Sequence, residues 1–126
     1  MLALDYGTAR IGCAISDPSG TLATPLPVIE PPAPSAVAEL VAQREVERVL
    51  VGLPLHLSGA EGSQAALTRT FCAELEAILD VPVETYDERL TTRMADRSAR
   101  EGARADRDSL AAAHLLESYL SREGGT

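Results

Sequence analysis

Short apolar segments alternate with helical patterns in the second half of the chain, and this alternation most limits the possible folds. Strands are predicted at residues 48–53 and 81–87. The helix between them should begin near Ser58 and Glu61, which match a capping box. Its apolar positions at helical spacing are Leu67, Phe71, Leu75, Ile78 and Leu79. A strand–helix–strand order predicts parallel strands with right-handed crossovers, and hence an α/β fold class.

The first third of the chain predicts antiparallel strands instead. Residues 1–5 and 11–15 are largely apolar, and glycines flank the joint between them, which favours a hairpin. A third strand near residues 22–29 overlaps a segment, 25–34, that holds five of the eight prolines, as is typical of an edge strand. The sequence therefore predicts a mixed sheet.

Three further helices complete the prediction and place helices on both faces of this sheet. Ser35 can cap the first of them, and a second should run from residue 91 or 92 to Gly102. The last is expected from about Asp108 to Leu120. Its apolar face holds Ala112, Leu115, Leu116 and Tyr119.

Size and composition exclude several classes of protein. A chain of 126 residues is long enough for one domain, expected here over residues 1–126. No apolar run could cross a membrane, and the first residues resemble no secretory signal, so we expect a cytoplasmic protein without a membrane partner. Cys13 and Cys72 lie far apart and indicate neither a zinc site nor a disulfide framework.

Charge is distributed unevenly along this acidic chain. The net charge is −8, which taken alone argues against a nucleic-acid partner. Residues 89–107, however, carry a net charge of +3, and the remainder carries −11. The segment is typical either of a solvated face or of a surface for phosphate. Its six arginines are Arg89, Arg93, Arg97, Arg100, Arg104 and Arg107.

Acidic residues follow two of the predicted parallel strands. Asp5 ends the first strand, Asp87 and Glu88 end the strand at 82–87, and Asp108 opens the last helix on its sheet-facing stripe. Because open sheets bind ligands at the carboxyl ends of their parallel strands, these carboxylates could share one edge. Such oxygen ligands suit Mg²⁺ or Mn²⁺, and two such ions can catalyse phosphodiester cleavage.

Each acidic residue also has a purely structural interpretation. Asp5 could end a strand in a turn, and Asp87 and Glu88 could be the solvated end of another strand. Asp106 and Asp108 could cap a helix. The residues alone leave both interpretations open.

Four segments resemble the signature blocks of the YqgF/RuvX family, in family order and across nearly the whole chain. This family comprises Holliday-junction-resolvase-like proteins that are also described as pre-16S rRNA nucleases. The resemblance implies an RNase H-like fold with a five-stranded mixed sheet flanked by helices. The blocks are Leu4–Gly12, Val51–Leu55, Asp87–Thr92 and Asp108–Ala113.

The resemblance also implies a divalent-metal nuclease site. Asp5, Glu88 and Asp108 match the metal-binding and catalytic positions, with Asp106 as the alternative third ligand and Asp87 as a less favoured catalytic residue. Residues that match substrate-binding positions are Thr8, Arg10, Arg89 and Arg93. His56 departs from the family, which usually has asparagine there, and the basic loop before the last helix is short.

The implied partner is a structured nucleic acid, either an RNA precursor or branched DNA. A junction resolvase requires paired active sites and hence a homodimer, whereas an RNA-processing nuclease can act as a monomer. Two other functions stay open. One is a ribosome-assembly factor that binds nucleic acid without catalysis. The other is a single lobe of an actin-like nucleotide-binding protein, since those proteins also begin with Asp-x-Gly-Thr, as at Asp5–Thr8.

Overall fold

Five strands form one mixed sheet. The computed structural model describes residues 1–20, 22–90 and 104–124, with the backbone alone at 104–106 and 123–124. The strands are β1 (Leu2–Tyr6), β2 (Ile11–Ser16), β3 (Ala23–Ile29), β4 (Val49–Leu53) and β5 (Val83–Asp87). Their order in the sheet is β3-β2-β1-β4-β5. β1 is antiparallel to β2 and parallel to β4, and β4 is parallel to β5, which confirms the mixed sheet expected from the sequence.

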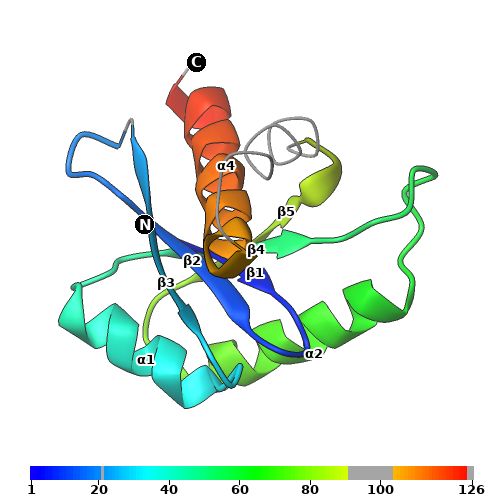
Figure 1. Cartoon of the computed structure of the whole chain (residues 1–126), viewed down its shortest axis with the longest axis horizontal. Helices are drawn as coiled ribbons and strands as arrows, with labels where there is room; N and C mark the ends of the chain where they lie inside the picture. Colours follow the sequence, from blue (N-terminus) through cyan, green and yellow to red (C-terminus); the bar gives the residue numbers. More distant parts are fainter. Residues whose placement is uncertain (21, 91–103, 125–126) are drawn as a thin grey trace.

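Helices cover both faces of the sheet, as expected (Figure 1). α1 (Pro34–Gln43) and α2 (Ser63–Ile78) lie on one face, and α4 (Arg104–Gly124) lies on the other. A 3-10 turn, η1 (Glu88–Leu90), follows β5. Among the described helices, none is both long and apolar enough to cross a membrane. The helix predicted up to Gly102 lies outside the described residues.

Alternating side chains divide the core into two layers. In β1, Leu2 and Leu4 pack with residues of α1 and α2, whereas Ala3 packs with Leu115 and Leu116 of α4. Because successive side chains in a strand point to opposite faces, Asp5 lies on the α4 face, like Ala3. The carboxyl end of β1 therefore presents a carboxylate beneath the first turns of α4.

The starts of α1 and α2 differ from the prediction. α1 begins at Pro34 rather than after a Ser35 cap, because proline at the first position already has a helical φ. The N-cap of α2 is Gly62, so the capping box at Ser58 and Glu61 was also wrong. Glu61 instead accepts two hydrogen bonds from Arg69, at 2.7 and 2.8 Å.

The apolar face of α2 was only partly predicted. Phe71 and Leu75 are buried as expected, but Leu67 and Ile78 are 45% and 50% exposed. The buried stripe includes smaller residues (Ala65, Thr68 and Cys72), which let the helix pack closely on the sheet. The helical spacing of large apolar residues, on which the prediction rested, does not reveal this stripe of smaller ones.

α4 begins at Arg104, about one turn before the predicted start at Asp108. The interpretation of Asp108 as a helix cap was therefore wrong. Residues 104–107 contain no large apolar side chain, so apolar periodicity does not reveal that the helix begins there. The predicted inner face is correct, since Ala112, Leu115, Leu116 and Tyr119 are all buried.

Candidate active site

Asp5 lies at the centre of the candidate site, between two glycines on neighbouring strands. It pairs with Gly12 of β2, and the parallel register of β1 with β4 brings Gly52 to its other side. Neither glycine carries a side chain toward α4, so space is left open on both sides of the Asp5 carboxylate. In the sequence, Gly12 is a turn signal and Gly52 belongs to the family block expected to line the cleft, but neither pattern predicts contact with an acidic side chain.

Glu88 occupies the space above Gly52. A Cβ atom added to Gly52 would lie 2.7 Å from Glu88 Oε1 and 2.9 Å from its Cγ. The Glu88 side chain therefore lies directly on the backbone of β4. From there it is hydrogen-bonded to Asp5.

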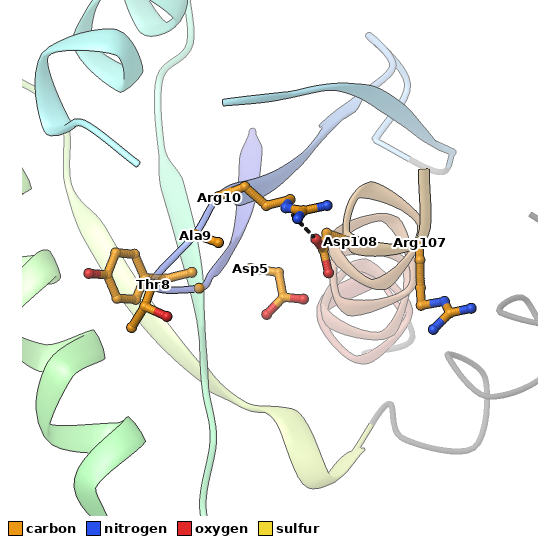
Figure 2. A pocket seen from close by; sticks show the side chains of 8 residues that line it. Asp5, Thr8, Ala9, Arg10, Arg107 and Asp108 are labelled. Carbon is orange, nitrogen blue, oxygen red and sulfur yellow. Dashed lines mark ion pairs between the residues drawn. The ribbon is translucent and has the colours of Figure 1, made fainter. Parts of the chain in front are cut away.

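Asp108 approaches from the opposite side, above Gly12. A Cβ atom on Gly12 would lie 2.0 Å from the backbone oxygen of Asp108, so α4 touches the backbone of β2. The neighbouring Ser109 fixes this contact, because its hydroxyl accepts a hydrogen bond from the Cys13 amide at 3.2 Å and donates one to the Leu26 carbonyl at 2.6 Å. Figure 2 shows the carboxylates of Asp5 and Asp108 directed into the same space.

Burial and two acidic neighbours perturb Asp5 strongly. Burial is the largest cause, followed by the hydrogen bond with Glu88 and the negative charges of Glu88 and Asp108. Together they raise the pKa of the Asp5 carboxyl to about 8. Asp5 thus holds a proton at neutral pH unless a cation compensates its charge.

Arg10 forms an ion pair with Asp108, its Nε lying 3.7 Å from Oδ2 (Figure 2). The same Nε lies 3.6 Å from Glu30 Oε2. A cavity of about 370 Å³ opens beside this ion pair. It is lined by Asp5, the turn at 6–10, Arg107 and Asp108.

The carboxylates suit a hard divalent cation in their chemistry, because all donors are oxygen atoms. Gly52 leaves room for two of them, Asp5 and Glu88, to meet. Across the residues that the structure describes, however, no three Asp, Glu, His or Cys side chains are already arranged to hold a metal ion. The donor types therefore fit such a cation, while Asp108, the third ligand expected from the sequence, is paired with Arg10.

The remaining residues predicted to bind substrate lie in different surroundings. Thr8 is exposed on the turn that lines the cavity, whereas Arg89 points to Asp87 and to the Leu57 carbonyl. Arg93 lies outside the described residues, as does the side chain of Asp106. Arg107, which was not singled out, also lines the cavity, although Figure 2 shows its side chain extending away from Asp5.

Comparisons with known proteins agree on one family. A family model described as "RuvX: Holliday junction resolvase" matches residues 1–122. A "Putative pre-16S rRNA nuclease" of Chloroflexus aggregans is 44% identical over 95% of this chain and 92% of its own length. The protein of the same name from Desulforudis audaxviator is 42% identical over 99% of this chain and 96% of its own length.

Solved structures support the fold. Thermus thermophilus RuvC, determined in complex with a Holliday junction substrate, has a TM-score of 0.63 and covers 98% of this chain and 96% of its own. At 16% identity, this similarity establishes an RNase H-like fold and nothing further. The family match and the relatives decide the rest: the chain belongs to the RuvX family of Holliday junction resolvases, and it is a nuclease.

Proposed function

We propose that this nuclease hydrolyses phosphodiester bonds of a structured nucleic acid with divalent cations held by Asp5, Glu88 and Asp108. One observation carries the proposal. Asp5 is held against Glu88 and close to Asp108, and its pKa is raised to about 8. Such a cluster of acids is unfavourable unless a proton or a cation neutralises it, and burial makes the requirement stronger.

Each side chain has a defined task in this proposal. Bound Mg²⁺ or Mn²⁺ would supply an activated water and stabilise the leaving oxygen. Asp5 would hold the cation as a carboxylate, without its proton, and Glu88, which lies over Gly52, would supply a second oxygen ligand. Asp108 would supply the third, in place of its ion pair with Arg10. Arg10 would then be available to a substrate phosphate, for which guanidinium geometry is well suited.

The comparisons support two candidate substrates. Their names point to precursor 16S rRNA, and the family description points to a four-way DNA junction. Cleavage of a junction would need a homodimer with two paired sites, whereas cleavage of RNA would need one site. Either reaction fits the cytoplasmic location expected from the sequence.

A cleavage assay tests the proposal. The parent protein is compared with Asp5→Asn and with Asp80→Asn, a control at an exposed aspartate beyond the end of α2. Each protein is incubated with Mg²⁺, Mn²⁺ or EDTA and with four substrates: precursor rRNA, single-stranded RNA, duplex DNA and a four-way junction. We expect metal-dependent cleavage by the parent and by Asp80→Asn, and none by folded Asp5→Asn.

The pattern of products then identifies the substrate. Cleaved precursor with intact junction means an RNA-processing enzyme, and symmetric cuts in the junction mean a dimeric resolvase. Cleavage that persists in Asp5→Asn contradicts the proposed site. Binding without any Asp5-dependent cleavage would instead indicate an assembly factor.

A further inference from the structure

Asp87 and Arg89 stand on either side of Glu88 and bind each other. Asp87 Oδ1 accepts a hydrogen bond from the backbone N–H of Arg89 at 2.9 Å, which closes the 3-10 turn that contains Glu88. The guanidinium adds further bonds, from Nε to both carboxylate oxygens at 3.0 and 2.9 Å and from Nη2 to Oδ2. The two residues therefore join the end of β5 to the turn that follows it.

Arg89 also reaches a second segment of the chain. Residues 54–62 join β4 to α2 and are called the 54–62 loop below. Arg89 Nη1 donates a hydrogen bond of 3.0 Å to the Leu57 carbonyl in this loop. Gly59 lies beside the guanidinium, since a Cβ atom there would be in ordinary van der Waals contact with Nη1, at 3.7 Å. Its φ of +91° is what favours glycine at this position.

The Arg89 guanidinium is therefore hydrogen-bonded to the protein on two of its edges. Nε and Nη2 face Asp87, and Nη1 faces the Leu57 carbonyl. Arg89 is only about one-third exposed and Asp87 about one-quarter, at 35% and 24% of their side-chain surfaces. An arginine that binds only a substrate phosphate would present all three of its nitrogens to solvent. In Arg89 each of the three already donates a hydrogen bond to the protein.

We propose that Asp87 and Arg89 are positioning residues, a clamp that holds Glu88 over Gly52 and fixes the 54–62 loop beside it. The inference rests on the proposed function, because the position of Glu88 matters for metal binding only if Glu88 is a ligand of the cation. It differs from the role suggested by the motif, in which Arg89 contacts substrate phosphate. The two roles predict opposite effects for a change at Asp87.

Metal affinity provides the first test. Mn²⁺ binding is measured by calorimetry for the parent, Asp87→Asn, Arg89→Lys and the double variant. Partners of this kind typically contribute about 10- to 100-fold to metal affinity. We expect each single variant to bind Mn²⁺ at least about tenfold more weakly, and the double variant to be no weaker than either single one. Lysine at position 89 should not preserve the Mn²⁺ affinity, because an ammonium group cannot bind both Asp87 and the Leu57 carbonyl as a guanidinium does.

Arg69→Lys is the matched control. Arg69 makes the same kind of two-pronged pair with Glu61, at the other end of the 54–62 loop, without touching the turn that holds Glu88. Its Mn²⁺ affinity should equal that of the parent. If Arg69→Lys weakens Mn²⁺ binding as much as Arg89→Lys does, general loosening of the loop is responsible and the clamp is refuted.

Kinetics separate positioning from phosphate binding. A positioning role predicts a lower kcat with little change in KM for both Asp87→Asn and Arg89→Lys. A phosphate contact predicts that Asp87→Asn releases Arg89 and tightens substrate binding, and that lysine largely preserves binding. Either of those two results would overturn the inference.

Hydrogen exchange tests the clamp without any metal. Within the loop, the His56 amide is bonded to the Ala60 carbonyl at 3.0 Å and the Gly59 amide to the His56 carbonyl at 2.8 Å. Both amides should exchange at least about tenfold faster in Asp87→Asn and Arg89→Lys, and unchanged exchange would refute the clamp. A parent protein that binds no Mn²⁺ would refute the proposed function, while this exchange would still report on the clamp.

Discussion

Replacing Asp5 with asparagine should stabilise the metal-free protein while abolishing cleavage. The pKa of Asp5 is raised from 3.8 to about 8, first by burial and then by Glu88 and Asp108. The native state therefore keeps a proton that the unfolded chain loses, so stability falls as the pH rises from about 4 to about 8. Asparagine cannot ionise and is free of this penalty.

The magnitude follows from the size of the shift. One pKa unit corresponds to about 1.4 kcal/mol, so between pH 4 and pH 7 the penalty is at most about 4 kcal/mol. Relaxation around Glu88 reduces it, and we expect Asp5→Asn to gain about 2 kcal/mol at pH 7. In a chain of this size, that gain raises Tm by about 8 °C.

Thermal unfolding in EDTA at pH 5.5, 7 and 8.5 measures the effect. The gap in Tm between Asp5→Asn and the parent should widen with pH and be largest at pH 8.5. With Mn²⁺ at about 100 times its Kd, the parent alone should gain about 2.7 kcal/mol, which narrows or reverses the gap. A Tm gap that stays constant across this pH range would contradict the raised pKa of Asp5. An Asp5→Asn protein that Mn²⁺ stabilises as much as the parent would contradict the role of Asp5 in binding the cation. Asp80→Asn should follow the parent throughout.

The two glycines beside Asp5 and the nearby arginine yield three more predictions. Gly12→Ala should lower the free energy of unfolding, measured with urea, by about 2–3 kcal/mol, because its Cβ would lie 2.0 Å from the Asp108 backbone oxygen and α4 would have to move. A decrease below about 1 kcal/mol would contradict this packing. Gly52→Ala should change stability by less than about 1 kcal/mol, because its Cβ meets the flexible Glu88 carboxylate at 2.7 Å. It should nevertheless weaken Mn²⁺ binding in calorimetry by at least about tenfold, and parent-like affinity would show that the position of Glu88 is unimportant. Arg10→Gln should make the plot of log substrate affinity against log salt concentration less steep by about 1. The affinity is measured by fluorescence anisotropy with a labelled substrate. An unchanged slope would exclude a phosphate contact from Arg10.

The sequence predicted the sheet well because the strands carry their own signals. Strands β1 and β4 consist largely of apolar residues that are buried from both sides, as expected of parallel strands between two layers of helices. The strand pattern also predicted that the three acidic residues of the proposed site lie together, because two strand ends and the start of a sheet-facing helix meet at one edge of the sheet. The structure brings Asp5 to Glu88 and near Asp108.

Features that depend on contacts between distant segments could not be predicted. Ser58 and Glu61 match a helix cap locally, but Arg69 lies close enough in the fold to bind Glu61 instead. Gly52 looks like any strand glycine until the Glu88 side chain is seen lying on it. The contact of Arg89 with the Leu57 carbonyl is likewise visible only in the folded chain, because the two residues are 32 positions apart.

Anomalous diffraction from crystals soaked in Mn²⁺ locates the cation that Asp5 and Glu88 are proposed to bind. We expect an anomalous peak about 2 Å from carboxylate oxygens of both residues, with Asp108 contacting the ion in place of Arg10. Crystals of Asp5→Asn should show no peak there. A parent crystal at saturating Mn²⁺ with no peak between Asp5 and Glu88, or with Mn²⁺ bound only elsewhere, would show that these carboxylates do not form the metal site.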